Sequence, residues 1–316
     1  MAPPVWIVTD GKIGDVVQCR GVAAGLSGQV DEFVVAPRTF YERLAPWGPA
    51  DPKDAIFGVL KAKGVPAVVI ASGRRAIPYA REIKKAGAEK VFVAILKDPR
   101  IRAQYADLIW APLHDHRSGD HVFSTLTSPH GMAGKIAQAS KHPSPVIAAL
   151  PPPVLGVVLG GPSGGARYGS DEARALACAI ETARVNFASV AITPSRRTPA
   201  SFTAQLRDAI APKNLFLWDG SEKNPYHDIL GVSSTLIVAA DSHNMMSEAV
   251  STRAGVYAWR PPGLAKKLDE FVCALEAQGR VRPFNGIADA FDGSPIDATA
   301  QIIDEIQRRR RTQGKA

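Results

Sequence analysis

Midway along the chain, residues 154–165 read VLGVVLGGPSGG, a short apolar run followed directly by a glycine-rich segment. Such a run is typical of a strand that is buried on both faces, as in a parallel sheet. The glycines permit a tight loop whose amides can approach a ligand closely. A helix is expected from about Ser170, because Ser170, Asp171 and Glu172 supply a cap and an acidic first turn. The stretch therefore predicts the first strand, loop and helix of an α/β domain.

The same alternation of apolar runs and helical patterns begins near the N-terminus. Strands are expected at residues 5–9, 33–36, 67–71, 91–95 and 108–111, and again at 154–159, 189–193, 215–217, 235–239 and 256–258. Helical patterns lie between them, for example at residues 16–26, 54–63 and 77–86. This alternation is typical of βαβ units with a mostly parallel sheet. Because 316 residues exceed the usual size of one core, we expect two Rossmann-like domains that face each other across a cleft.

Prolines mark the border between the two halves. Pro143 and Pro145 are soon followed by Pro151-Pro152-Pro153, which cannot enter a helix or a central strand and so predict an extended connector. We expect an N-terminal domain at residues 1–148 and a C-terminal domain at residues 149–295. Residues 296–316 are expected to form an amphipathic helix and a basic tail, with apolar side chains at helical spacing at Ala298, Ile302, Ile303 and Ile306.

Composition narrows the range of partners. The formal net charge of +8 favours an acidic partner. Aromatic residues make up only 7% and no basic stretch is interleaved with them, so we expect no nucleic-acid partner. Four consecutive arginines, Arg308 to Arg311, have two interpretations: a solvated, frayed C-terminus, or a weak peripheral contact with anionic lipid.

Targeting signals and cysteines bear on the compartment. We expect no signal peptide, because the given sequence enters a strand almost at once, and no segment has the ~20 apolar residues of a membrane span. Cys19, Cys178 and Cys273 form no Cys-x-x-Cys pair, which indicates neither a zinc site nor a disulfide framework. Cys19 and Cys178 are expected in helices as small core residues. We expect a cytoplasmic protein, with the inner face of the membrane as the place for any contact through the basic tail.

Ligands of doubly wound sheets bind beyond the carboxyl ends of the strands, so the residues that follow each strand are the informative ones. The first strand is followed by Asp10-Gly11-Lys12-Ile13-Gly14-Asp15, with Gln18 one turn further on. Lys12 beside a helix N-terminus favours an anion. The dinucleotide fingerprint G-x-G-x-x-G and the P-loop lysine spacing are both absent, so nicotinamide and flavin are not expected. The structural alternative is a plain turn in which Asp15 caps the helix.

Paired arginines follow one strand in each half. The first pair lies in Ser72-Gly73-Arg74-Arg75 and the second in Ser195-Arg196-Arg197-Thr198. Arginine forks suit phosphate or carboxylate. The structural alternative is that one arginine of each pair is solvated or bonded to a neighbour.

A histidine-rich loop follows the strand at residues 108–111. It contains His114-Asp115-His116 and, further on, His121. No ligand spacing on a helix supports a metal site there, so we expect no metal. His114 or Asp115 is expected to act as a base or to contact a substrate.

The second half contains the longest polar segments. The loop that starts with Gly160-Gly161 can wrap a diphosphate with its amides. Two segments follow, Asn224-Pro225-Tyr226 and Asp241-Ser242-His243-Asn244-Met245-Met246-Ser247-Glu248-Ala249. Glu248 can accept hydrogen bonds from ribose hydroxyls while the helix N-terminus faces phosphate. In the structural alternative, Asp241 or Ser242 only caps the helix.

The Ser247-Glu248-Ala249 segment resembles the donor site of glycosyltransferase-B (GT-B) enzymes, in which an acidic residue holds the ribose of a sugar nucleotide. The full set of motifs is similar to the mitochondrial-fission "elongated mitochondria" family, over residues 5 to about 259. Bacterial members of that family are labelled glycosyltransferases or, in older naming, sugar-nucleotide epimerases.

The resemblance implies a GT-B fold and a glycosyltransferase that needs neither cofactor nor metal. A nucleoside-diphosphate sugar would bind the C-terminal domain, and an unidentified acceptor, such as a cell-envelope glycan or lipid, would face the N-terminal domain. The implied donor residues are Gly160, Gly161, Ser195, Arg196, Arg197, Asn224, Asp241, Ser242, Met245, Ser247 and Glu248. The implied catalytic residues are Asp10, Lys12, His114 and Asp115, and the acceptor-side residues are Gly11, Gly14, Gln18, Ser72, Gly73 and Arg74.

Two alternatives remain open. The chain could be a non-catalytic adaptor that keeps the GT-B fold and binds partners through its surface or tail. An epimerase is a more distant alternative, because the nicotinamide fingerprint and a suitably placed Tyr-x-x-x-Lys pair are both missing.

Overall fold

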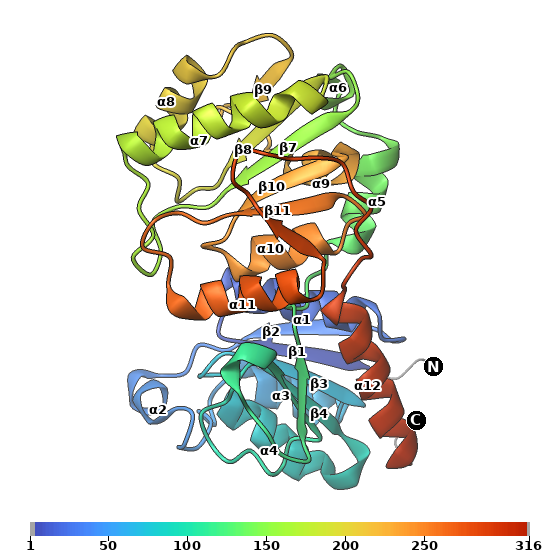
Figure 1. Cartoon of the computed structure of the whole chain (residues 1–316). Helices are drawn as coiled ribbons and strands as arrows, with labels where there is room; N and C mark the ends of the chain where they lie inside the picture. Colours follow the sequence, from blue (N-terminus) through green and yellow to red (C-terminus); the bar gives the residue numbers. More distant parts are fainter. Residues whose placement is uncertain (1–3, 315–316) are drawn as a thin grey trace. The chain divides into compact units, whose positions relative to one another are not determined.

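The computed structural model describes residues 4–314 and divides into two compact units (Figure 1). Unit 1 comprises the chain up to Gly131 together with the chain from Ala298 onwards, and unit 2 comprises Met132–Asp297. Each unit contains one six-stranded sheet in which all the paired strands are parallel. The predicted α/β fold with two Rossmann-like domains is therefore confirmed.

The sheet of unit 1 has the strand order β2-β1-β3-β4-β5-β6. Its strands are β1 (Val5–Thr9), β2 (Val30–Val34), β3 (Val68–Ser72), β4 (Phe92–Leu96), β5 (Leu108–Pro112) and β6 (Val122–Thr125). Its helices are α1 (Ile13–Ala24), α2 (Thr39–Leu44), α3 (Ala55–Lys63), α4 (Ile77–Gly87) and α12 (Ala298–Thr312), with 3₁₀ turns η1 (Ala88–Lys90) and η2 (Leu113–Asp115).

Alternate residues of the unit 1 strands face opposite layers of helices. Trp6, Val69 and Val93 belong to the core that α3 and α4 cover, whereas Ile7, Ile70 and Ala94 belong to the core under α1 and α12. This is the burial expected of a parallel sheet with helices on both faces.

The last helix, α12, packs in unit 1 rather than beside the second sheet. Ala298, Ile302 and Ile306 are fully buried, so the predicted amphipathic helix is confirmed. A side-chain carbon added at Gly25 would lie 2.1 Å from Ile303 Cδ1, so the glycine allows α12 to approach α1 closely. Because α12 continues to Thr312, the interpretation of the four arginines as a frayed terminus is wrong for these residues.

The sheet of unit 2 has the order β12-β11-β10-β7-β8-β9. Its strands are β7 (Val154–Leu159), β8 (Ser189–Pro194), β9 (Leu215–Leu217), β10 (Thr235–Ala239), β11 (Gly255–Trp259) and β12 (Val281–Pro283). Its helices are α5 (Ala133–Lys141), α6 (Pro145–Ala148), α7 (Ser170–Ala183), α8 (Ala200–Ala209), α9 (Tyr226–Val232), α10 (His243–Val250) and α11 (Lys266–Ala277), with a 3₁₀ turn, η3 (Arg184–Asn186).

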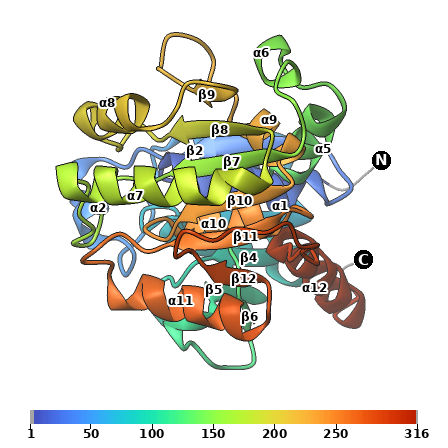
Figure 2. The same cartoon turned by 45° about the horizontal axis from the view of Figure 1, so that its top comes forward.

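Helices cover both faces of this second sheet as well. Leu176 and Ile180 of α7 and Phe202 of α8 pack on one face, and Figure 2 shows α7 lying along the strands. Ile147 of α6 and Ile229 of α9 pack on the other face. The sequence pattern grouped residues 133–148 with the first half, whereas α5 packs on α9 within unit 2.

The two cysteines that the sequence places in the core differ in exposure. Cys19 is buried as expected, but the expectation of a core position for Cys178 is wrong, since its side chain lies on the exposed side of α7.

Within residues 4–314, no helix combines the length and the apolar character that crossing a bilayer requires.

Candidate functional site

In unit 1 the loop after β1 is held tightly against the loop after β3. The carboxyl group of Asp10 is buried, and a side-chain carbon at Gly73, whose φ is +94°, would lie 2.4 Å from Asp10 Cγ. Lys12 Nζ lies 3.5 Å from Asp10 Oδ2. Arg75 donates to the main-chain carbonyl of Asp10 at 2.9 Å. The structure thus brings Asp10, Lys12 and Gly73 together at the carboxyl edge of the sheet.

The first turn of α1 carries a second polar group at the same edge. Asp15 does not cap the helix, because the N-cap is Lys12, which has no side-chain cap bond, and the Asp15 carboxylate pairs with Lys97. The capping alternative for Asp15 is therefore wrong. Gln18, one turn on, is 2% exposed, and its Oε1 has no hydrogen-bond partner among residues 4–314.

The hydroxyl and arginines after β3 bond to the protein itself. Ser72 donates to the carbonyl of Leu96 at 2.9 Å, and Arg74 donates to the carbonyl of Ala45 at 2.9 Å. Arg75 bonds both Glu42, at 3.2 Å, and the Asp10 carbonyl. The alternative that these arginines serve the structure therefore applies to both members of the first pair.

The residues of the histidine loop after β5 lie at opposite edges of the sheet. His114 and Asp115 lie in η2 at the carboxyl end of β5, with Nε2 and Oδ1 3.9 Å apart. His121 precedes β6 and so lies at the opposite edge of the parallel sheet. No group of three or more His, Cys, Asp or Glu side chains within the described residues could hold a metal ion.

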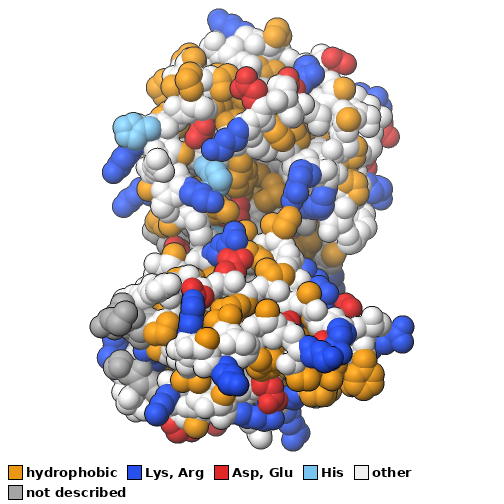
Figure 3. Space-filling model, turned by 180° about the vertical axis from the view of Figure 1, so that it is seen from behind, with side chains coloured by type: hydrophobic (Ala, Val, Ile, Leu, Met, Phe, Trp, Pro, Cys, Tyr) orange, Lys and Arg blue, Asp and Glu red, His pale blue; other side chains and the backbone are white. Residues whose placement is uncertain are grey.

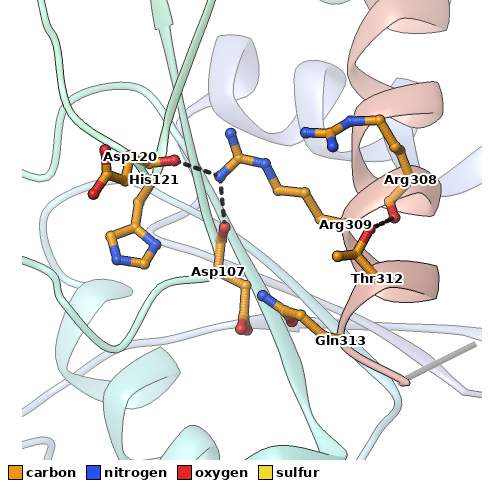
Figure 4. A pocket seen from close by; sticks show the side chains of 7 residues that line it. All are labelled: Asp107, Asp120, His121, Arg308, Arg309, Thr312 and Gln313. Carbon is orange, nitrogen blue, oxygen red and sulfur yellow. Dashed lines mark hydrogen bonds between the residues drawn. The ribbon is translucent and has the colours of Figure 1, made fainter.

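A pocket with a volume of about 280 Å³ lies at that opposite edge, and Figure 4 shows its lining side chains, among them Asp120, His121 and Arg309 of α12. Arg309 donates to the carbonyls of Asp107 and Asp120 at 2.9 and 3.1 Å. Arg308 and Arg309 both donate to Glu305 at 2.6–2.7 Å. The two guanidinium groups, Arg308 more than Arg309, lower the pKa of the Glu305 carboxyl to about 2. Arg309 of the basic tail therefore holds α12 against the rest of unit 1, whereas Arg308 bonds Glu305 within the helix.

In unit 2 the loops after β7 and β8 are locked together. Ser195 donates to the Gly160 carbonyl at 2.9 Å, and Thr198 donates to the same oxygen. Arg197 donates to the Gly161 carbonyl at 3.0 Å and to Asp241 Oδ2 at 3.0 Å. A side-chain carbon at Gly160 would lie 2.0 Å from Asp241 Oδ1, so only glycine fits.

Asp241 is the centre of this cluster. Its carboxylate is fully buried and accepts from the Gly161 amide at 3.0 Å, from Arg197 and from the Tyr168 hydroxyl. Burial and the nearby Asp241 charge raise the pKa of Tyr168. Because both carboxylate oxygens accept hydrogen bonds from the protein, Asp241 shapes the glycine loop.

Arg196 differs from its neighbour Arg197. Its side chain is exposed and makes no hydrogen bond or ion pair within residues 4–314. It lies directly after β8, at the carboxyl edge where ligands of such sheets bind. In the second arginine pair, one guanidinium is therefore structural and the other is available to an anion.

Glu248 lies on α10 and is only 9% exposed. Tyr226, the first residue of α9, donates its hydroxyl to Glu248 Oε2 at 2.5 Å. Burial raises the pKa of Glu248 to about 6, while the hydrogen bond from Tyr226 and the charge of Lys135 act in the opposite direction. Burial and the Glu248 charge also raise the pKa of Tyr226.

The other predicted donor residues support these loops. Ser242 is the N-cap of α10 and accepts from the Met245 amide at 3.4 Å, so the capping alternative holds for Ser242. Ser247 donates to the His243 carbonyl at 2.8 Å inside the helix. Asn224 accepts from Thr193 at 2.9 Å, which ties the segment before α9 to the end of β8.

A sequence profile of the family described as mitochondrial fission ELM1 matches residues 13–310. The chain belongs to the mitochondrial fission ELM1 family. This confirms the resemblance inferred from the motifs. One relative is the Arabidopsis thaliana mitochondrial fission protein ELM1, which is 31% identical over 281 residues. The match covers 80% of this chain and 66% of the plant protein, so the chain spans just under two thirds of the length of that relative.

Solved structures place this ELM1-family chain among GT-B folds. The UDP-GlcNAc 2-epimerase from Neisseria meningitidis bound to UDP-GlcNAc has a TM-score of 0.53 at 13% identity, covering 99% of this chain and 94% of that one. MurG from Acinetobacter baumannii has a TM-score of 0.50 at 13% identity, covering 97% of this chain and 99% of that one. At such low identity these likenesses establish the fold alone.

Sequence reasoning missed three residues that contact or support the candidate site. Lys97 directly follows β4 and pairs with Asp15, so the rule that ligand-site residues follow strands could have identified it. Tyr168 lies in the loop between β7 and α7 and bonds Asp241 from a distance of 73 residues in sequence. Arg280, also unforeseen, donates to the carbonyls of Val250, Thr252 and Ala254, which anchors the segment after α10. No local sequence pattern predicts the contacts of Tyr168 or of Arg280.

Proposed function

We propose that this ELM1-family protein binds a nucleoside-diphosphate sugar at the carboxyl edge of the unit 2 sheet and transfers the sugar to an acceptor. The observation that carries the proposal is the buried carboxyl group of Glu248, which has Tyr226 as its one hydrogen-bond partner among the described residues. Burying a carboxyl group with so little compensation is costly. A ligand that donates hydroxyl hydrogen bonds, such as ribose, would offset that cost.

Arg196 and the start of α10 supply the positive charge that a diphosphate needs. Arg196 is exposed and unpaired within the described chain, and α10 begins at His243 after its Ser242 cap. A helix N-terminus carries a partial positive charge and free amides. Four hydrogen bonds hold the Gly160-Gly161 loop, so its shape is set before a ligand binds. Ser195, Thr198 and Arg197 donate to its carbonyls, and its Gly161 amide donates to Asp241.

Transfer needs a leaving group that is stabilised and an acceptor that is deprotonated. An acceptor hydroxyl oxygen would form a bond to the anomeric carbon as the bond from that carbon to the phosphate oxygen breaks, and the diphosphate would leave with the electron pair. Arg196 would stabilise the charge that develops on the diphosphate. In an inverting reaction, a carboxylate or imidazole base on the acceptor side would take the proton of the hydroxyl.

One comparison supports the choice of ligand. The Neisseria protein of the same fold was solved bound to UDP-GlcNAc. UDP-sugars are therefore the first ligands to test, followed by GDP-, ADP- and CMP-sugars and the free nucleotides.

Calorimetric titration of the full chain tests the proposal, with Glu248→Gln as the test variant and Glu270→Gln as the control. Glu270 lies on α11 of the same unit and its side chain is 50% exposed. Saturable binding of one sugar nucleotide that weakens in Glu248→Gln by about 1–3 kcal/mol, the range for a lost hydrogen bond to a charged group, would support the donor site. The Glu270→Gln variant should bind like wild type.

A second measurement separates the transferase from the adaptor alternative, which the printed name of the plant relative keeps open. Release of nucleoside diphosphate from the bound sugar nucleotide, abolished in an Arg196→Ala variant that still folds, would support catalysis. Absence of binding by every nucleotide in well-folded protein would overturn the transferase proposal in favour of an adaptor.

A further inference from the structure

Three large apolar side chains around α2 of unit 1 point into solvent. Phe40 is 66% exposed, Leu44 is 39% exposed and Trp47 is 67% exposed, and α2 buries none of its residues. Phe40 and Leu44 are four residues apart and so share one face of the helix. Leu44 also lies close to Gly48 in the turn that carries Trp47. These three side chains are called the aromatic patch below.

The turn that carries Trp47 is held in a fixed conformation. Arg74 donates to the Ala45 carbonyl at 2.9 Å, and Arg81 donates to the carbonyls of Trp47 and Gly48 at 3.3 and 2.5 Å. The Gly48 amide donates to the Leu44 carbonyl at 2.8 Å. The backbone of this turn is therefore held in place, and the Trp47 side chain that it carries is exposed. Exposed apolar groups of this kind mark interaction surfaces.

Exposed positive charge lies near the aromatic patch in sequence, at Arg43 and Lys53. The acidic side chains nearby are engaged, since Glu42 pairs with Arg75 at 3.2 Å and Asp51 pairs with Arg38 at 2.8 Å. Arg43 and Lys53 are exposed, and neither side chain has an ion pair within residues 4–314. Figure 3 shows hydrophobic side chains next to Lys and Arg at the α2 end of unit 1.

An apolar pocket extends this surface. It has a volume of about 520 Å³ and is lined by Tyr41, Pro49, Ala50, Pro52, Phe57, Glu82 and Lys85. Glu82 is bonded to Lys85 at 2.9 Å, so the rim adds no free negative charge.

We propose that the aromatic patch docks unit 1 on an anionic lipid bilayer. Tryptophan and phenylalanine partition to the level of the headgroups, and lysine and arginine beside them are attracted to anionic lipid. Phe40, Leu44 and Trp47 would enter the interface while Arg43 and Lys53 contact the headgroups. The proposal does not depend on the transferase function proposed above.

Flotation of the full chain with vesicles tests the proposal. We expect binding to vesicles of phosphatidylcholine mixed with phosphatidylglycerol, weak binding to phosphatidylcholine alone, and release by salt. Trp47→Ser and Phe40→Ser should each weaken binding by about tenfold, because each removes a large apolar side chain from the interface. Val185→Ser, which changes an apolar side chain 79% exposed in unit 2, should bind like wild type.

Charge variants separate the aromatic patch from the basic tail. Arg43→Glu should weaken binding, whereas Arg311→Glu on α12 should leave it unchanged. The five tryptophans all lie in the described chain, and Trp47 is the exposed one, so its fluorescence should shift to shorter wavelength on binding and lose its accessibility to iodide.

Three results would overturn the proposal: no flotation of wild type, equal flotation of folded Trp47→Ser, or loss of flotation in Arg311→Glu alone. Concentration-dependent dimerisation that Trp47→Ser abolishes, without vesicle binding, would assign the aromatic patch to a second copy of the chain instead. Thermal unfolding of each variant establishes that it is folded.

Discussion

The carboxyl edges of the two sheets carry similar residues that are used in different ways. Each edge has a hydroxyl followed by two arginines after a strand, at residues 72–75 in unit 1 and 195–197 in unit 2. In unit 1 both arginines bond protein groups, whereas in unit 2 Arg197 does so and Arg196 does not. The same motif therefore builds a loop in unit 1, whereas in unit 2 it leaves Arg196 without a hydrogen bond or ion pair to any residue in the range 4–314.

Glutamates make a second contrast between the units. Glu305 of unit 1 lies between two arginines, which lower its pKa to about 2. Glu248 of unit 2 is buried beside a neutral hydroxyl, and its pKa rises to about 6. A carboxyl group that is poorly compensated inside the protein is a candidate ligand contact, whereas a fully paired one holds structure.

Substitution of the two edge glycines should have the largest effect. Gly73→Ala and Gly160→Ala would each place a carbon within 2.4 Å of a carboxyl atom, of Asp10 and Asp241 respectively. We expect each to lower the free energy of unfolding by about 2–4 kcal/mol, with Gly73→Ala the more severe because its φ of +94° adds backbone strain. Urea unfolding measures both.

Gly58→Ala is the matched control, since no atom lies within 4 Å of a side-chain carbon there and the residue is inside α3. It should raise the free energy of unfolding by about 0.5–1 kcal/mol. A Gly160→Ala variant as stable as Gly58→Ala would show that the glycine loop is not locked against Asp241.

Removal of the Asp241 carboxylate should have the next largest effect. Asp241→Ala removes the acceptor of the Gly161 amide and of the Tyr168 hydroxyl, and it removes one of the two acceptors of Arg197. Because the first two are buried, we expect a loss of about 2–3 kcal/mol in thermal or urea unfolding. Arg196 precedes Arg197 in sequence and is exposed and unpaired within residues 4–314. Arg196→Ala should therefore change the free energy of unfolding by no more than about 0.5 kcal/mol. Equal losses for the two variants would contradict the distinction drawn between these loops.

The sequence predicted most of the fold because the central strands are continuous apolar runs. Residues 5–9, 154–159 and 235–239 were predicted with the bounds that β1, β7 and β10 have. The strands β6 and β12 were missed because they are short and only partly buried, and α2 was missed because it buries no side chain. Patterns of burial cannot reveal elements that bury little.

The candidate site could be predicted only as a set of loops. Their position after strands follows from the topology of parallel sheets, so Asp10, Arg196 and Asp241 were found. Whether a side chain bonds to the protein depends on residues distant in sequence, such as Tyr168 for Asp241 and Ala45 for Arg74. The sequence pattern contains no information on those contacts. It therefore does not distinguish an arginine that bonds to the protein from one that is available to a ligand.

The pH dependence of stability should distinguish the two glutamates. Glu248 holds its proton more tightly in the folded protein than in the unfolded chain, because its pKa is raised from 4.5 to about 6. Its contribution to stability is therefore full below pH 4.5 and is lost as the pH rises through 6, by up to about 2 kcal/mol. Glu248→Gln should remove this loss, so urea unfolding of the variant and of wild type should diverge above about pH 5. Parallel curves across that range would place the Glu248 carboxyl in contact with water.

Glu305 should behave in the opposite sense with a smaller amplitude. Its pKa is lowered from 4.5 to about 2, so its contribution is present above pH 4.5 and is lost as the pH falls towards 2. Because the Arg308 side chain is 60% exposed and screened by water, we expect Glu305→Gln to cost only about 1 kcal/mol at neutral pH. The difference in free energy of unfolding between wild type and Glu305→Gln should shrink in acid. The difference between wild type and Glu248→Gln has the opposite sign and should shrink below pH 4.5. If both variants were destabilised at neutral pH, Glu248 would be a structural carboxylate like Glu305, and the argument for an available ligand contact in unit 2 would fail.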